Sequence, residues 1–259
     1  MPVKIRAANV TKVYAARTGP VYAVRNFNLE VQEGEFVCIV GPSGCGKTTF
    51  LRILGSLIPP SSGEVTLAPG GAQVPLQNIV FQEYAIFPWK TVLDNVAFGL
   101  EMRKVPKAER QEIAQEWIRK VGLAGSADKY PHQLSGGMKQ RVSIARAFAN
   151  NPEILLMDEP LGALDAQTRA VLQEELVHLW EGSSKTIVYI THSIEEAVLL
   201  GDRVVLMTAH PGTNKSEFAV PFERPRQLAL TGTPEFSQLT YGIWKELESE
   251  VKQALEQQR

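Results

Sequence analysis

The sequence predicts an α/β fold built around a mixed, largely parallel β-sheet. Two observations predict it: short apolar runs alternate with longer segments of helical periodicity, and these runs are continuous. Continuous apolar runs are typical of strands buried on both faces of a parallel sheet, and the strand–helix rhythm is typical of α/β folds. The core strands are expected at 35–40, 154–157, 186–190 and 203–207.

Helices are expected between these strands, and segments with other patterns of hydrophobic residues lie outside this core. The predicted core helices cover 47–57, 137–149, 167–181 and 194–200. Segments 3–10 and 21–31 alternate more openly, which predicts an N-terminal antiparallel β subdomain. Over 92–130, apolar residues recur at helical spacing without a buried strand, which indicates a helical insertion subdomain. A closing amphipathic helix is expected over 239–258.

The composition excludes several classes of protein. With 44% hydrophobic residues in 259, the chain can bury the core of one large or two small domains, so a disordered or collagen-like chain is excluded. A net charge of −1 counts against non-specific nucleic-acid binding, which needs a basic surface. No apolar run approaches the ~18–20 residues of a membrane span, and the N-terminus lacks a secretory signal, which favours the cytoplasm. The two cysteines, Cys38 and Cys45, are expected to be reduced.

A phosphate-binding loop (P-loop, residues 41–49) follows the first core strand. It satisfies the pattern G-x-x-x-x-G-K-[ST] in the strand–loop–helix context that the motif requires. Glycines let backbone N–H groups approach phosphates at a helix N-terminus, the lysine adds positive charge, and the next threonine offers a hydroxyl to Mg²⁺. The alternative is a glycine-rich turn that only begins a helix. The expected nucleotide-binding residues of this loop are Gly41, Pro42, Ser43, Gly44, Cys45, Gly46, Lys47, Thr48 and Thr49.

Two adjacent carboxylates close a later core strand. Asp158 and Glu159 follow the apolar run 154–157. A P-loop protein needs an acid at a strand end for the Mg²⁺ shell, and Asp158 fits that role. Because successive strand residues point to opposite sides, Glu159 can instead reach an attacking water as a general base. Two solvated acids at a strand end are the alternative.

A second glycine-rich helix start separates the classes of P-loop protein. The P-loop alone leaves kinases, GTPases, helicases and transport ATPases open, and the N/T-K-x-D motif of GTPases is not found. In the segment 134–141 (Leu-Ser-Gly-Gly-Met-Lys-Gln-Arg), Ser135 is a candidate N-cap, and Gly136 and Gly137 leave room for a phosphate. This segment predicts a second anion cradle, although by itself it also fits an ordinary capped helix.

These motifs, in this order, resemble the ATP-binding cassette (ABC) family in its transporter ATPase branch. The match extends over about residues 3–208, with 134–138 similar to the family signature and 162–165 to the D-loop. Four single residues resemble further family positions. They are Gln82 of the Q-loop, Asp165 of the D-loop, the switch histidine His192, and Tyr14, which resembles the aromatic that stacks on adenine. Taken alone, His192 also fits a capping or core histidine and Tyr14 a packing residue.

The resemblance implies a P-loop NTPase core and a division of the chain. The ATP-binding domain is expected over 3–230, with a helical subdomain at about 90–145 within it, and a C-terminal helical tail over 231–259.

The resemblance also implies ATP hydrolysis with Mg²⁺ between two copies of the chain arranged head to tail. The implied catalytic residues are Lys47, Glu159 and His192, and the implied Mg²⁺ ligands are Thr48, Gln82 and Asp158. Ser135 is expected to contact the γ-phosphate held by the P-loop of the other copy, with Gly136, Gly137 and Asp165 also at the nucleotide. Hydrolysis then depends mainly on positioning and electrostatics.

A single cassette with a short tail favours the separate ATPase subunit of an importer. The implied partners are an integral membrane permease and, indirectly, a solute-binding protein, with the chain peripheral on the cytoplasmic face of the inner membrane. No nucleic acid is expected. Residues 83–96 resemble the segment that touches a permease's coupling helix, where Phe87 and Trp89 are anchors or, alternatively, pack the helical subdomain.

Within importers, three segments resemble ATPases for small anions such as nitrate, sulfonate, taurine or bicarbonate: 87–96, 161–169 and 210–212. Tyr84 and Phe87 depart from that group, and 82–87 is also similar to sugar- and polyamine-type cassettes, which usually carry an additional C-terminal domain. A soluble ABC ATPase that acts on nucleic acid is the other alternative. His132, His178 and His210 are assigned no function.

Overall fold

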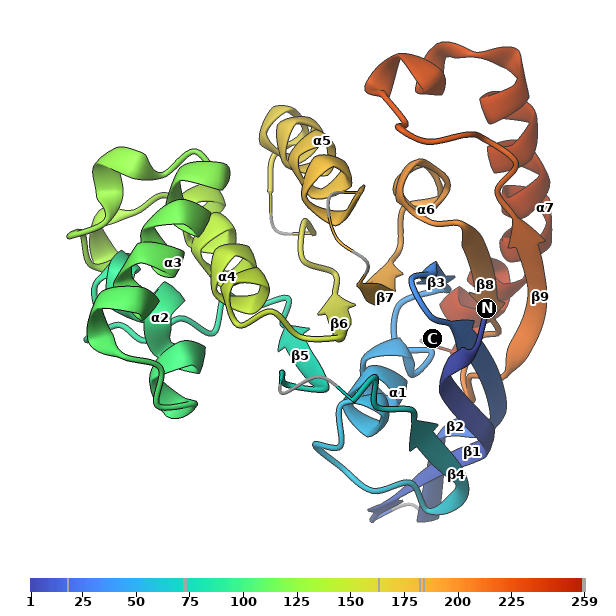
Figure 1. Cartoon of the computed structure of the whole chain (residues 1–259). Coiled ribbons are helices and arrows are strands. Elements are labelled where there is room, and N and C mark those ends of the chain that lie inside the picture. The colour runs from blue at the N-terminus through green and yellow to red at the C-terminus, as the bar shows by residue number, and fades with distance from the viewer. Residues whose placement is uncertain (18, 72–73, 163, 182, 184, 258–259) are drawn as a thin grey trace.

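The computed structural model describes residues 1–17, 19–71, 74–162, 164–181, 183 and 185–257. Figure 1 shows a sheet in the middle of the molecule, a helical part on one side, and an antiparallel sheet and the C-terminal helix on the other.

The central sheet has six strands in the order β5-β6-β7-β3-β8-β9. The first five strands are parallel, and β9 pairs antiparallel with β8 at the edge. Their bounds are β5 Gln77–Val80, β6 Ile154–Asp158, β7 Thr186–Thr191, β3 Phe36–Val40, β8 Arg203–Met207 and β9 Asn214–Ala219. Every residue of β3, β6 and β7 is buried, which explains their continuous apolar runs.

The second sheet is antiparallel, in the order β2-β1-β4. It comprises β1 (Val3–Ala16), β2 (Gly19–Gln32) and β4 (Ser62–Leu67). The first strand runs six residues beyond the predicted end, because the segment 11–16, which becomes exposed from Tyr14 onward, pairs with β2 as an extended ribbon. No strand was predicted at β4, whose residues are exposed or only half-buried and so lack an apolar run.

Helices cover both faces of the central sheet. Alternate residues of β3 face different clusters, because side chains alternate across a strand: Val37 and Ile39 pack with α1 (Lys47–Leu54) and the antiparallel sheet. Phe36, Cys38 and Val40 pack on the other face, with α5 (Ala166–Glu181), α6 (Ile194–Leu200) and α7 (Pro234–Gln257). Helix α1 ends at Leu54 rather than at the predicted residue 57, since Ser56 takes a left-handed conformation (φ 56°).

The helical part is formed by α2 (Val92–Met102), α3 (Lys107–Lys120) and α4 (Gly136–Ala149), with a hydrophobic cluster of its own. Its buried side chains include Val96, Ile118 and Val142, one from each helix. Their helical spacing in the sequence is explained by this shared core. Helix α4 also packs against β5, which joins the helical part to the sheet edge.

The C-terminal third departs most from the prediction. Strand β9 was not predicted, because only one face of this edge strand is covered and its sequence, Asn-Lys-Ser-Glu-Phe-Ala, is largely polar. Helix α7 begins at Pro234, before the predicted residue 239, and Gln258 of the predicted range lies outside the described residues. Within the described part of the chain, no helix is long and apolar enough to cross a bilayer.

Candidate nucleotide site

The P-loop joins β3 to α1, and its lysine is folded back onto the loop itself. Lys47 Nζ donates hydrogen bonds to the carbonyl oxygens of Gly41 (2.8 Å) and Pro42 (2.9 Å) and is only 6% exposed. At the helix start, Gly46 has φ 108°, and a Cβ there would lie 2.3 Å from the carbonyl oxygen of Ala23. Only glycine fits this position, because both the conformation and the space exclude a side chain.

Asp158 ends β6 beside the first turn of α1. Thr48 Oγ1 donates a 2.9 Å hydrogen bond to Asp158 Oδ1, so the hydroxyl and the carboxylate converge on one point. Burial raises the pKa of Asp158, while the hydrogen bond from Thr48 works in the other direction. A hydroxyl and a carboxylate are the hard oxygen donors that Mg²⁺ prefers, so this pair fits that ion.

Glu159 is at the centre of the candidate site. Its Oε2 lies 3.3 Å from His192 Nδ1 and accepts a 3.5 Å hydrogen bond from Gln82 Nε2, while its Oε1 lies 4.0 Å from Lys47 Nζ. The backbone is left-handed at Glu159 (φ 43°), which is strained for a residue with a side chain. Hydrogen bonds from its N–H to Ile190 O (3.0 Å) and from Gly162 N–H to its carbonyl (3.0 Å) hold it there.

The contact with His192 sets the protonation of both groups. The hydrogen bond from His192 and the charge of Lys47 lower the pKa of Glu159, although burial opposes this. The same hydrogen bond raises the pKa of His192, again against the effect of burial. Glu159 is therefore ionised at neutral pH, as a residue that accepts a proton from water must be.

A cleft of about 360 Å³ opens at this cluster. Eight of the predicted residues line it: Ser43, Gly44, Gly46, Lys47, Thr48, Thr49, Gln82 and Glu159. Gly41, Pro42 and Ser43 line a neighbouring pocket together with His192. Cys45 is buried behind the loop, and burial raises the pKa of its thiol, so it packs as a neutral side chain.

The signature segment lies on α4, outside this cleft. Ser135 is the N-cap of α4, and its side chain accepts a hydrogen bond from the N–H of Met138 (3.3 Å). A Cβ added at Gly136 would lie 2.7 Å from the hydroxyl of Tyr84, and one at Gly137 would lie 2.9 Å from Thr168 Cγ2. The two glycines therefore let the Q-loop and the start of α5 approach the helix closely.

Two other predicted residues do not line the cleft. Asp165 Oδ1 accepts a hydrogen bond from the N–H of Thr168 (2.9 Å), so it caps the start of α5. Its D-loop neighbour Ala163 lies outside the described residues. Tyr14 is 41% exposed on β1, with the ammonium group of Lys12 5.4 Å from its ring. The adenine-stacking role of Tyr14 and the phosphate contacts of the signature stay predictions.

Sequence reasoning assigned no function to His210, yet the structure places it on the wall of the cleft with Lys47 and Glu159. It also gave no role to the contact between Tyr84 and Gly136. Tyr84 and His210 both reach the site through loops, which follow β5 and β8, and the family segments that contain them (83–96 and 210–212) do not indicate a contact at the site. The only signal was the His-Pro-Gly turn at 210–212, whose glycine marks a close backbone approach.

A groove of about 500 Å³ lies between the helical part and the sheet edge. Phe87 lines it, with its ring 4.5 Å from that of Phe98 and the guanidinium of Arg146 5.5 Å away. Trp89 is 71% exposed, 5.5 Å from the Phe87 ring. Phe87 thus contributes to the packing of the helical part, whereas most of Trp89 is free for another surface.

Comparisons with known proteins agree with this geometry. A family model described as ABC transporter matches residues 24–162. An uncharacterized ABC transporter ATP-binding protein of Methanocaldococcus jannaschii is 49% identical over 252 residues, 95% of this chain and 93% of that protein. A bicarbonate transport ATP-binding protein of Synechocystis sp. is 48% identical over 225 residues (84% and 79%). A nitrate import ATP-binding protein of Synechococcus elongatus is 43% identical over 236 residues (89% and 86%).

Solved structures show the same fold. A dimeric ABC transporter cassette superposes with a TM-score of 0.74 at 37% identity, covering 85% of this chain and 100% of that one. A post-hydrolysis state of an ATP-binding cassette, bound to ADP and Pi, superposes with a TM-score of 0.73 at 36% identity and the same coverage. The predicted fold class, with its mixed sheet and antiparallel β subdomain, is confirmed.

Fold and site together define a P-loop nucleotide hydrolase. The chain belongs to the ABC transporter family, of which it is an ATP-binding and ATP-hydrolysing member coupled to transport.

Proposed function

We propose that this chain powers a membrane importer for a small anion such as nitrate, sulfonate, taurine or bicarbonate. Relatives at 48% and 43% identity that carry the names of bicarbonate transport and nitrate import proteins support this substrate class. The observation that carries the ATPase function is the convergence of Lys47, Glu159 and His192 at the end of parallel strands.

The proposed roles follow from these contacts. Lys47, now bound to carbonyl oxygens of its own loop, turns to the β- and γ-phosphates when ATP binds. Glu159 accepts a proton from the attacking water, and His192 holds Glu159 and contacts the γ-phosphate. Electrostatic stabilisation of the charge on the transferred phosphoryl group supplies most of the rate.

Mg²⁺ fits the donors present at the site. Thr48, Asp158 and Gln82 would hold it, because their hydroxyl, carboxylate and amide oxygens match its preference. When bound, the ion neutralises negative charge on the β- and γ-phosphates. The 2.9 Å bond between Thr48 and Asp158 orients both donors beforehand.

The proposed assembly is a head-to-tail dimer on the cytoplasmic face of the inner membrane. The dimeric state of the cassette that superposes on this chain supports it. In it, Ser135, Gly136 and Gly137 of one copy contact the γ-phosphate at the other copy's P-loop. A membrane permease docks in the groove beside Phe87, with Trp89 as an anchor, and a solute-binding protein acts through the permease. The proposed division is an ATP-binding domain over 3–230, including the helical subdomain at about 90–145, and a tail over 231–259.

The test is ATP hydrolysis and solute uptake by membranes that contain the chain with its permease. Wild type should hydrolyse ATP and import a labelled small anion, and Lys47→Ala should abolish both. Lys252→Ala, which changes an exposed lysine on α7, is the matched control. Stimulation by nucleic acid without permease association would favour the nucleic-acid alternative, and uptake of a sugar or polyamine instead would exclude the anion class.

A further inference from the structure

The loop between β8 and β9, residues 208–213, forms one wall of the nucleotide cleft (the His210 loop). His210 lines the cleft, and Gly212 N–H donates a 3.2 Å hydrogen bond to the carbonyl oxygen of Ala23. A Cβ at Gly212 would lie 2.2 Å from the carbonyl oxygen of Cys45 within the P-loop. The His210 loop is thus in direct backbone contact with the P-loop, so a shift of one displaces the other.

The His210 loop is closed by its own hydrogen bonds. Thr208 N–H donates to Thr213 O (3.0 Å), Thr213 N–H donates to Thr208 Oγ1 (2.9 Å), and Thr208 Oγ1 donates to Pro211 O (3.1 Å). These hydrogen bonds tie the two ends of the loop together. The N–H of Ala209, a buried residue, is bound from outside the loop.

That outside partner is Glu250 of α7. Its Oε2 accepts a 2.8 Å hydrogen bond from Ala209 N–H, and its Oε1 lies 2.7 Å from Lys215 Nζ on β9. The side chain is 12% exposed. A partly buried carboxylate with two partners fixes the position of a backbone group more strongly than a neutral acceptor does.

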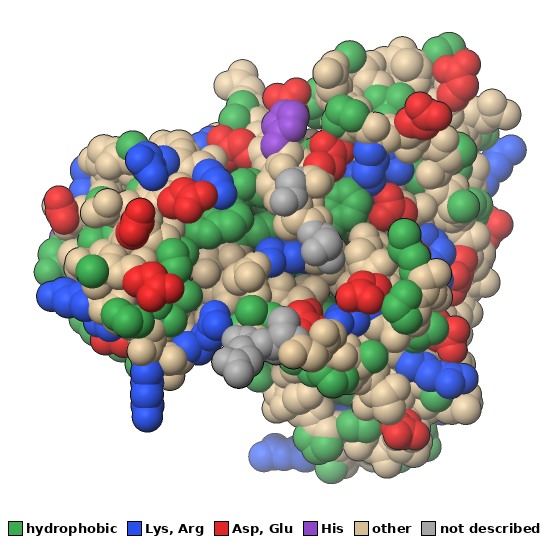
Figure 2. Space-filling view, in the orientation of Figure 1, with side chains coloured by type: hydrophobic (Ala, Val, Ile, Leu, Met, Phe, Trp, Pro, Cys, Tyr) green, Lys and Arg blue, Asp and Glu red, His purple; other side chains and the backbone are tan. Residues whose placement is uncertain are grey.

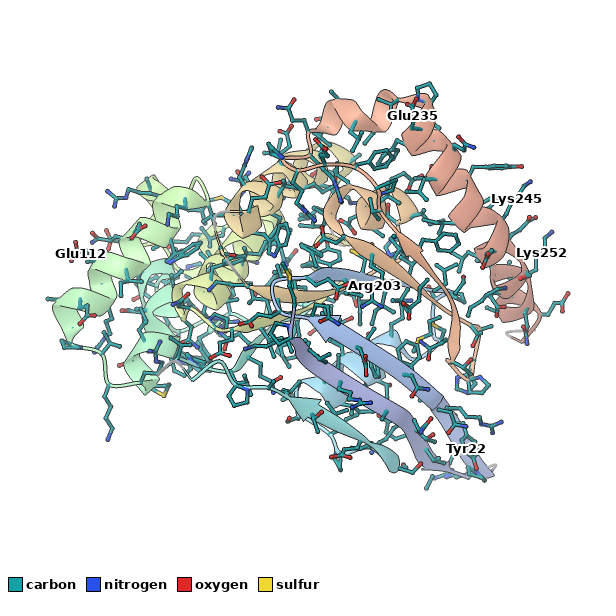
Figure 3. The ribbon with its side chains drawn as sticks, turned by 45° about the vertical axis from the view of Figure 1, so that its right-hand side comes forward. Tyr22, Glu112, Arg203, Glu235, Lys245 and Lys252 are labelled. Atoms are coloured by element: carbon teal, nitrogen blue, oxygen red, sulfur yellow. The ribbon has the colours of Figure 1, made fainter. Side chains whose placement is uncertain are left out.

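Helix α7 also faces the P-loop across a pocket, on the same side of the helix. Trp244, Leu247 and Val251 line a pocket of about 320 Å³ together with the segment 41–43 and His192. In Figure 3 the labelled Lys245 and Lys252 project from α7 away from the sheet. One side of this helix therefore faces the nucleotide site, while the other faces solvent.

We propose that Glu250 is a positioning residue for nucleotide binding. Through Ala209 it fixes the His210 loop, and the His210 loop fixes the P-loop backbone at Cys45, so the P-loop keeps the shape that receives phosphates. Neither Glu250 nor Ala209 touches the reacting atoms. The inference rests on the proposed function, since it requires the P-loop cleft to bind ATP.

The experiment measures KM and kcat for ATP, and binding of a fluorescent ATP analogue, in variants of the full chain. Glu250→Ala should raise KM and the dissociation constant about tenfold, as expected for loss of a hydrogen bond to a charged group, with a smaller change in kcat. Glu250→Gln keeps an acceptor oxygen for Ala209 but loses the charge that pairs with Lys215, so its KM should lie between those of the wild type and Glu250→Ala. Glu248→Ala, on the same helix with an exposed pair to Lys252, is the matched control and should leave KM unchanged.

A lowered melting temperature of Glu250→Ala with an unchanged KM would overturn the inference, because it would reduce Glu250 to a structural contact. If Glu250→Ala does not fold, Glu250→Asp takes its place, since the shorter aspartate side chain cannot reach both Ala209 and Lys215. An unchanged KM in Glu250→Asp would also overturn the inference. Lys47→Ala separates the two hypotheses. If it loses ATP binding and the Glu250 variants do not, only the positioning role fails; if it keeps ATP binding, the proposed function fails.

Discussion

The P-loop cleft and the signature segment are both glycine-rich helix starts, yet they differ in what surrounds them. In the cleft, Lys47, Thr48, Asp158 and Glu159 already contact one another or their own loop. At the signature, the hydrogen bond given above is the cap that Ser135 makes to its own helix. The neighbours of Gly136 and Gly137 are side chains, from Tyr84 and Thr168.

This difference shows how the proposed roles divide between the two glycine-rich segments. The cleft holds the carboxylates, the lysine and the histidine to which we assign hydrolysis. The signature holds backbone N–H groups at a helix N-terminus, to which we assign only the binding of a phosphate. Two copies, each giving its signature to the other's cleft, would join the two kinds of half-site.

The largest expected effect separates chemistry from binding in the cleft. Glu159→Gln should lower kcat by a factor of about 10² to 10⁴, the usual contribution of a general base. ATP should still bind, because the variant leaves unchanged Lys47, which we propose contacts the phosphates. Single-turnover hydrolysis and equilibrium binding of ATP measure the two quantities separately. A variant that keeps most of its kcat would remove Glu159 from the catalytic step.

The next effect is on the free energy of unfolding, and it compares one glycine of the P-loop with one glycine of the signature. Gly46→Ala should lower the free energy of unfolding by at least about 2 kcal/mol, since its Cβ meets a fixed backbone oxygen at φ 108°. Gly136→Ala should cost less than about 1 kcal/mol, because the nearby atom is the end of the Tyr84 side chain, which can turn away. Urea denaturation measures both. Gly44→Ala, with a positive φ but open space, is the control for the conformational part alone.

A pH titration gives the smallest effect and tests the charge balance of the cleft. The pKa of His192 should lie above its ordinary value of 6.5 and return toward it in Glu159→Gln, because the hydrogen bond that His192 donates to Glu159 is the main cause of the shift. NMR titration of the histidine ring protons measures this. An unchanged His192 pKa in Glu159→Gln would contradict the contact.

The sign of the accompanying stability effect follows from the two shifts. The raised pKa of His192 gives stability that is present below pH 6.5 and is lost as the pH rises through the folded-state pKa. The lowered pKa of Glu159 gives stability that is present above pH 4.5 and is lost as the pH falls through its folded-state pKa. The free energy of unfolding of the wild type should therefore exceed that of His192→Ala by the largest amount between pH 4.5 and pH 6.5.

The core strands and the grouping of the P-loop with Asp158 and Glu159 could be predicted, because each is encoded in a contiguous segment. Parallel strands bring their carboxyl ends to one sheet edge, so an acid that ends β6 must lie near the loop that follows β3. The burial of both faces of these strands also makes their sequences apolar throughout, which is easy to recognise.

Features that depend on distant contacts could not be predicted. Strand β9 exists because β8 offers it an edge to pair with, and its own polar sequence carries little strand signal. His210 reaches the cleft through loop closure, and Glu250 contacts the His210 loop through the docking of α7, which no local pattern encodes. The charged surface gave no guidance either, since acidic and basic side chains are intermingled on the face shown in Figure 2.

Helix α4 has a mechanical consequence because its two ends serve different surfaces. Its first residues form the signature, and Arg146 and Ala147 near its other end line the groove beside Phe87. Fourteen residues make a rod of about 21 Å, stiffened along its length by the helical core. A partner docked in the groove and a phosphate held at the signature would therefore contact opposite ends of one helix.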